Sequence, residues 1–208
     1  MRPAAIGVRM HSGWGALVVL SNSNDSLKVI DRRRIDVTDK ATAGIKQPYH
    51  FAKNLSPEDA GKFVGNCFAA SEKLAREALS KLLADLAVQR YCVVGAAILR
   101  ASGRPLPPLP NILASHALIH TAEGEFFRAT VSQACEELGL AVSGFRERDL
   151  DSYVQAALGK RASRTMRHIG TLGGVIGPPW TKDQKSASLA ALLVLTNNRK
   201  MPSDSAQR

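Results

Sequence analysis

The sequence predicts an α/β fold in which long helices flank a central mixed sheet. Three observations carry this prediction. Two apolar runs within residues 4–20 indicate a pair of strands, and helical periodicity covers residues 57–86 and 112–138. Short apolar runs of strand length alternate with these helices. The resulting order of strands, helix, strand, helix, strand and helix is typical of α/β domains.

Length and composition indicate a single domain. The chain has 208 residues, of which 45% are hydrophobic and 22% charged, and these values exclude wholesale disorder. We expect the domain to cover residues 1–196 and residues 197–208 to form a frayed tail. No apolar stretch reaches the ~18 residues that span a bilayer, and no signal peptide is recognised, so we expect a cytoplasmic protein without a membrane partner.

The first strands are expected to form an antiparallel meander. Residues 6–20 supply two strands around a short break, and β-branched residues within 27–37 indicate a third. A long helix follows at 57–86, where Ser56 is placed to cap the helix and Pro57 suits its first position.

The rest of the chain alternates buried strands with helices. The continuous apolar run YCVVGAAIL is typical of a central strand that is covered on both faces, and the prolines after it end regular structure. The expected elements are a strand at 91–99, a loop at 103–110, a helix at 112–138, a strand at 140–145, and helices at 150–158 and 186–195.

Positive charge predicts an anionic partner. The net charge is +10, and residues 159–182 contain no acid. Such a basic surface neutralises phosphate groups, which favours nucleic acid as a partner, although a solvated face that maintains solubility would look the same. The basic residues of this segment are Lys160, Arg161, Arg164, Arg167 and Lys182.

The order of elements resembles the RNase H-like fold, and within it the Holliday-junction resolvases of the RuvC type. In that family the first strand reads approximately Ile-Gly-Ile-Asp-Pro-Gly before a return strand; here Ile6-Gly7-Val8-Arg9, Gly13 and GALVVL occupy those places. The segments EFFRATVSQACEELGLAV, FRERDLDSYVQAALGKRASRTMRHI and PPWTKDQKSASLAALLVL resemble later parts of the resolvases. The similarity covers residues 4–196.

The resemblance implies carboxylates that hold two Mg²⁺ ions for phosphodiester cleavage, but these carboxylates are missing. Arg9 stands where the first-strand aspartate is expected, and Asp183 is the acid that remains near the last helix. The other expected positions fall on Gly95 or Ala96, and about Lys185 and Ser188. We therefore expect no catalytic residue, no metal and no cofactor.

Other sites are less favoured by their sequence context. His116, His120 and Glu123 share one helix face and could ligate a metal, but a polar surface stripe is the preferred interpretation. The glycine-rich segment 170–180 lacks the ending of a phosphate-binding P-loop and is expected to be a mobile connection. No cysteine has zinc-finger spacing, so Cys67, Cys92 and Cys135 are expected in the core.

Two functional hypotheses follow. The favoured one is a non-catalytic RNase H-like protein that binds nucleic acid or another anion through Arg9 and the basic residues of 159–182. The alternative is a divergent metal-dependent nuclease with relocated acids. Candidates for these acids are Asp31, Asp36, Glu72 and Asp183.

The charge of the Arg9 guanidinium can be balanced in two main ways. A third and less favoured arrangement is simple exposure on the surface. Arg9 either pairs with an acid such as Asp183 or faces a cleft that an anion can enter, because a buried guanidinium without a partner is costly. Gly7 and Gly13 would leave room for a ligand beside it. The oligomeric state is left open.

Overall fold

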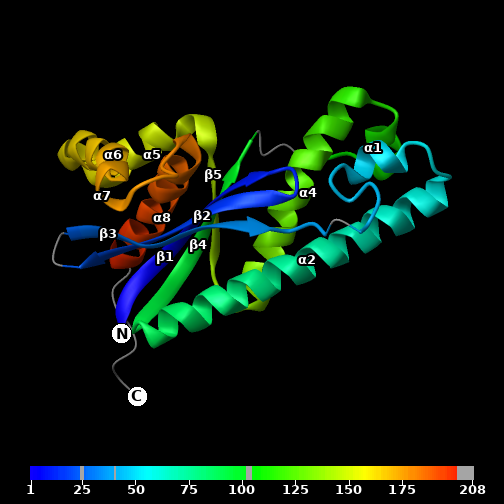
Figure 1. Cartoon of the computed structure of the whole chain (residues 1–208). Helices are drawn as coiled ribbons and strands as arrows, with labels where there is room; N and C mark the ends of the chain where they lie inside the picture. Colours follow the sequence, from blue (N-terminus) through cyan, green and yellow to red (C-terminus); the bar gives the residue numbers. More distant parts are fainter. Residues whose placement is uncertain (24–25, 40, 102–104, 201–208) are drawn as a thin grey trace, which may run out of the picture.

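Five strands form one central mixed sheet in the order β3-β2-β1-β4-β5 (Figure 1). The computed structural model describes residues 1–23, 26–39, 41–101 and 105–200. β1, β2 and β3 pair antiparallel, whereas β4 is parallel to both β1 and β5. The predicted mixed sheet and its antiparallel meander are confirmed, and β3 and β5 are its edges. The strands are β1 (Arg2–His11), β2 (Trp14–Ser23), β3 (Ser26–Asp36), β4 (Tyr91–Arg100) and β5 (Val142–Arg146).

Helices cover both faces of the sheet (Figure 1). On one face, α2 (Pro57–Val88) and α4 (His116–Glu137) bury an apolar core against β1 and β4. On the other face, α8 (Lys182–Lys200) and α5 (Leu150–Leu158) form a second core. The shorter helices are α1 (Pro48–Ala52), α3 (Leu109–Leu113), α6 (Ala162–Thr171) and α7 (Gly173–Ile176). Within the described ranges, no helix combines the length and the hydropathy that crossing a membrane requires.

The alternation of side chains along β1 divides the two cores. Ile6 and Val8 are fully buried toward α2 and α4, while Ala5 is buried toward α8. At Gly7, α8 lies directly against the strand, because a Cβ there would overlap the backbone carbonyl of Ala187. The room expected at Gly7 for a ligand is therefore filled by α8.

Several helix boundaries differ from those expected from the sequence, among them the start of α8, which lies at Lys182 and not at 186. The helix expected at 112–138 is divided, because Ser115 has an extended backbone and its hydroxyl accepts a hydrogen bond from the amide of Leu118, which starts α4. At the other end, α8 continues to Lys200, past the expected start of a tail at 197. Residues 201–208 of that tail, and residues 102–104 of the proline-containing loop, lie outside the described residues.

The glycine-rich segment is held against the edge strand β3. The guanidinium of Arg32 donates to the four consecutive carbonyl groups of residues 176–179, at 2.6–2.9 Å. The indole N–H of Trp180 donates to the carbonyl of Ile169 at 2.8 Å. These bonds tie the segment to the sheet and to α6, in contrast to the mobile connection expected from its glycines.

The cysteines do not all lie in the core. Cys67 and Cys135 are buried, and burial raises the pKa of the Cys135 thiol to about 12. Cys92 is exposed near the start of β4, which corrects the expectation of three core cysteines. Because strand side chains alternate, its neighbour Tyr91 takes the inward position.

Candidate functional site

The candidate site lies where the carboxyl ends of the parallel strands meet. β1, β4 and β5 end at the same edge of the sheet, an edge at which α/β folds commonly place ligands. Arg9 comes from the last part of β1, and Glu147 follows β5 directly. Asp183 comes from the first turn of α8. Three charged groups that are remote in sequence thus meet at one place.

Arg9 joins the two carboxylates. Its Nε donates to Glu147 Oε2 at 3.0 Å, and its Nη1 donates to Asp183 Oδ1. This is the salt-bridge arrangement, one of those that the sequence leaves open. Burial acts to lower the pKa of Arg9, but the contacts with Glu147 and Asp183 outweigh it and raise that pKa above its ordinary value. Arg9 is therefore a permanent cation.

Aromatic and imidazole groups extend this cluster across the β1–β2 turn. His11 Nε2 lies 3.2 Å from Asp183 Oδ2 and 3.0 Å from Arg9 Nη1. A protonated His11 donates to the carboxylate, and a neutral one accepts from the guanidinium. The His11 ring stacks on Trp14 with a centroid distance of 4.2 Å, and Arg34 lies over the outer face of that indole. The polar cluster is thus closed on one side by stacked side chains.

A surface cavity of about 600 Å³ opens beside the cluster. Lys182 lines it, with Nζ 3.5 Å from Glu147 Oε1 and a side chain that is 78% exposed. The charged side chains in its lining carry a small net positive charge. Its charged residues are Arg100, Glu147, Arg148, Asp151 and Lys182.

The geometry at Arg9 disfavours a divalent metal between Glu147 and Asp183. Both carboxylates already contact the guanidinium, and a dication placed there would lie within a few ångströms of a positive charge. The strand β4 contributes no acid beside it. Gly95 and Ala96, where the resemblance places an acid, lie nearer the start of β4 than the level of Arg9. Ala96 pairs with Ile6, and the strand continues beyond it to Arg100.

The other acids considered as relocated ligands lie elsewhere. Each is next to an arginine of its own element: Asp31 with Arg33, Asp36 with Arg34, and Glu72 with Arg76. Within the part of the chain that the structure describes, Asp183 is thus the one of the four candidates that reaches the Arg9 cluster.

The basic residues around α6 form a separate surface, here called the α6 basic surface. It consists of Lys160, Arg161, Arg164 and Arg167, all exposed. Arg161 and Arg164 line a cavity of about 670 Å³ that also contacts Asn22 in β2. Among the described residues, none of the four forms an ion pair.

The α6 basic surface lies far from Arg9. Ala16 pairs with Arg9 across the β1–β2 ladder, and Asn22 is six residues further along β2, which corresponds to about 20 Å. Of the six residues predicted to bind an anion, the structure therefore brings Arg9 and Lys182 together at Glu147, and places the other four at the opposite end of the strands.

Sequence reasoning missed Glu147. It lies 138 residues from Arg9 and follows a strand of only five residues, so its spacing gives no direct signal. The signal that could have found it is its place directly after a strand. Parallel strands end on the same side of the sheet, so an acid that follows β5 lies near the end of β1.

Comparison with solved structures identifies the fold. RuvC of Thermus thermophilus in complex with a Holliday junction substrate is 15% identical, with a TM-score of 0.51 over 94% of each chain. A second Thermus thermophilus RuvC structure is 12% identical, with a TM-score of 0.52 over 94% of this chain and 95% of that one. Neither the protein-family models nor the curated proteins give a match. The chain therefore has the RNase H-like fold in the form seen in RuvC, to which it is distantly similar.

Proposed function

We propose that this chain is a non-catalytic protein of the RNase H-like fold that binds nucleic acid through basic side chains. The observation that carries the proposal is the position of Arg9 between Glu147 and Asp183. A guanidinium supplies permanent positive charge at the sheet edge where the resemblance implies Mg²⁺ and its carboxylates. The Arg9 guanidinium therefore supplies positive charge at this site, but it cannot activate a water molecule for phosphodiester cleavage as a bound metal would.

The exposed cations supply the binding surface in this proposal. The four side chains of the α6 basic surface have no acidic partner among the described residues, so they are free to neutralise phosphates. Lys182 adds an exposed charge at the other end of the sheet. Branched DNA is the first ligand to test, because a RuvC structure with a similar fold contains a Holliday junction substrate.

The purified chain is expected not to cleave a four-way DNA junction in Mg²⁺ or Mn²⁺. The reason is that Arg9 already pairs with the two carboxylates that could hold the ions, which places a permanent positive charge beside any metal bound there. The measurement is gel analysis of end-labelled junctions, with an active metal-dependent nuclease run in parallel as a positive control.

The alternative function is a divergent nuclease, and the meeting of Glu147 and Asp183 at one place favours it over other enzymes. Metal-dependent cleavage that disappears in both Asp183→Asn and Glu147→Gln would establish that alternative and overturn the non-catalytic proposal.

Binding is expected to depend on the α6 basic surface. The triple variant Arg161→Ala/Arg164→Ala/Arg167→Ala should bind a labelled junction more weakly, and the slope of log K against log salt should fall by about one for each phosphate that is no longer neutralised. Fluorescence anisotropy at several salt concentrations measures both quantities.

The matched control removes the same charge from another surface. Lys62, Lys73 and Lys81 are exposed on α2, so the triple alanine variant at these positions has the same net charge as the test variant. We expect the control to keep its salt slope. Equal losses in both variants would mean that binding reflects net charge alone, which contradicts a defined surface.

A further inference from the structure

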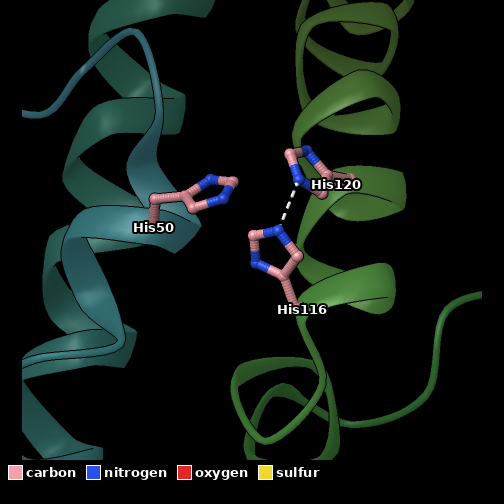
Figure 2. Close-up of side chains that lie close together, drawn as sticks. All are labelled: His50, His116 and His120. Carbon is pink, nitrogen blue, oxygen red and sulfur yellow. Dashed lines mark hydrogen bonds between the residues drawn. The ribbon is translucent and has the colours of Figure 1, made fainter.

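Three histidines from two separate elements point toward one another beside the start of the long helix α2. Figure 2 shows His50 on α1 facing His116 and His120, which lie one turn apart on α4. One ring nitrogen from each side chain lies within 4.8 Å of the others. The Nε2 atoms of His116 and His120 are 3.0 Å apart.

A buried carboxylate fixes the orientation of His50. Glu123 Oε1 lies 3.2 Å from His50 Nδ1 and accepts the backbone N–H groups of Tyr49 and His50 at 2.9 and 3.0 Å. The Glu123 side chain is only 7% exposed. A carboxylate at Nδ1 favours the tautomer that carries its proton there, which leaves Nε2 with a free lone pair.

We propose that His50, His116 and His120 bind one divalent transition metal of the Zn²⁺ class, with Glu123 behind His50 as the positioning carboxylate. Imidazole nitrogen is a preferred ligand for zinc and for the neighbouring metals copper and nickel. A carboxylate that receives the second ring N–H of a ligating histidine is the usual support of such sites. This proposal is independent of the proposed function, since it uses no residue of the Arg9 cluster or the α6 basic surface.

The spacing of the three rings suits a tetrahedral ion. Zn–N bonds of 2.0–2.1 Å place ligating nitrogens about 3.4 Å apart, so small side-chain rotations from the present separations complete the set. His116 and His120 are exposed, so an ion enters from solvent and its fourth position is open to water.

The sequence pattern pointed to a different set. It grouped Glu123 with His116 and His120 as possible ligands and favoured no metal at all. In the structure, Glu123 faces His50 instead, and His50 takes the third ligand position. The ion would then link α1 to α4, next to a small apolar cluster around Ile119 that is separate from the two main cores.

The test uses the full chain after a chelator has removed any metal. ZnCl₂ is titrated into this protein, and calorimetry measures the binding. We expect one ion per chain and a higher melting temperature with Zn²⁺ than with chelator. Co²⁺ provides a second readout, because three nitrogen ligands give visible d–d bands without the intense thiolate charge-transfer band of a cysteine site. A Co²⁺ spectrum dominated by thiolate bands would place the ion at a cysteine and overturn the proposal.

Variants distinguish ligands from the positioning residue. His116 and His120 are exposed, so His116→Ala and His120→Ala should each keep the circular dichroism spectrum of the native chain. Glu123→Gln should weaken Zn²⁺ binding roughly 10- to 100-fold. Each histidine variant should weaken it by more than that. His168→Ala removes an exposed histidine on α6 and should leave Zn²⁺ affinity unchanged. Native chain that binds Zn²⁺ no more tightly than the His116→Ala/His120→Ala double variant overturns the site.

Discussion

Replacing Gly7 by alanine is expected to lower the free energy of unfolding by about 3 kcal/mol, the upper part of the range for overpacking a well-packed core. The added methyl group would overlap the backbone carbonyl of Ala187 and lie 2.9 Å from the backbone nitrogen of Ala191. Backbone atoms in the middle of a helix cannot move aside as a side-chain end can. Relief therefore requires α8 to shift away from β1, which opens the second core.

Urea unfolding followed by circular dichroism measures this loss, and Gly65→Ala is its matched control. Gly65 lies on the exposed face of α2 with open space around its Cβ position, so alanine there should raise the free energy of unfolding by roughly 0.5–1 kcal/mol. Unchanged stability in Gly7→Ala would mean that α8 does not rest on β1.

Replacing Arg9 by alanine is expected to lower the free energy of unfolding by about 2–3 kcal/mol. The change removes the charged hydrogen bonds to both carboxylates and leaves Glu147 and Asp183 partly buried without their cation. Because contact with these acids raises the pKa of Arg9, its stabilising contribution is present wherever both carboxylates are ionised and the pH is below the ordinary arginine pKa. The loss should therefore be measurable throughout the neutral range.

Two further variants test the origin of that loss. Lys62→Ala breaks an ion pair with Glu58 whose side chains are 66% and 79% exposed, and it should cost less than about 0.5 kcal/mol. Arg9→Ala/Asp183→Asn should recover part of the stability lost in Arg9→Ala, because one uncompensated charge is removed. An Arg9→Ala variant as stable as Lys62→Ala would show that the cluster contributes nothing to folding.

The sequence predicted those parts of the fold that depend on local periodicity. Alternating apolar residues located the meander, and a capped amphipathic stripe located α2 with its start at Pro57. The break before α4 was missed because a serine inside an apolar helical pattern looks like an ordinary surface residue until its hydroxyl caps the amide of Leu118. Local backbone geometry decides such a break, and periodicity does not report it.

The candidate sites depended on contacts that periodicity does not encode. Asp183 could be named as a partner for Arg9 because both fell within segments with a recognisable resemblance. Glu147 and His50 could not, since each reaches its site only after distant elements have packed together. Gly7 was interpreted as room for a ligand, whereas tertiary packing used that room for a helix.

The edge strand β3 has a consequence for association between copies of the chain. The outer side of this eleven-residue strand has no neighbouring strand in the sheet and would offer a template for a further one, but it carries three consecutive arginines, Arg32 to Arg34. An antiparallel copy centred on Arg33 would set arginine against arginine, and like charges directly opposite are destabilising. Since Arg33 is already engaged with Asp31 and Asp85, its charge cannot turn away without breaking those pairs. Strand-by-strand polymerisation through this edge is therefore opposed by the same residues that anchor β3 within its own chain.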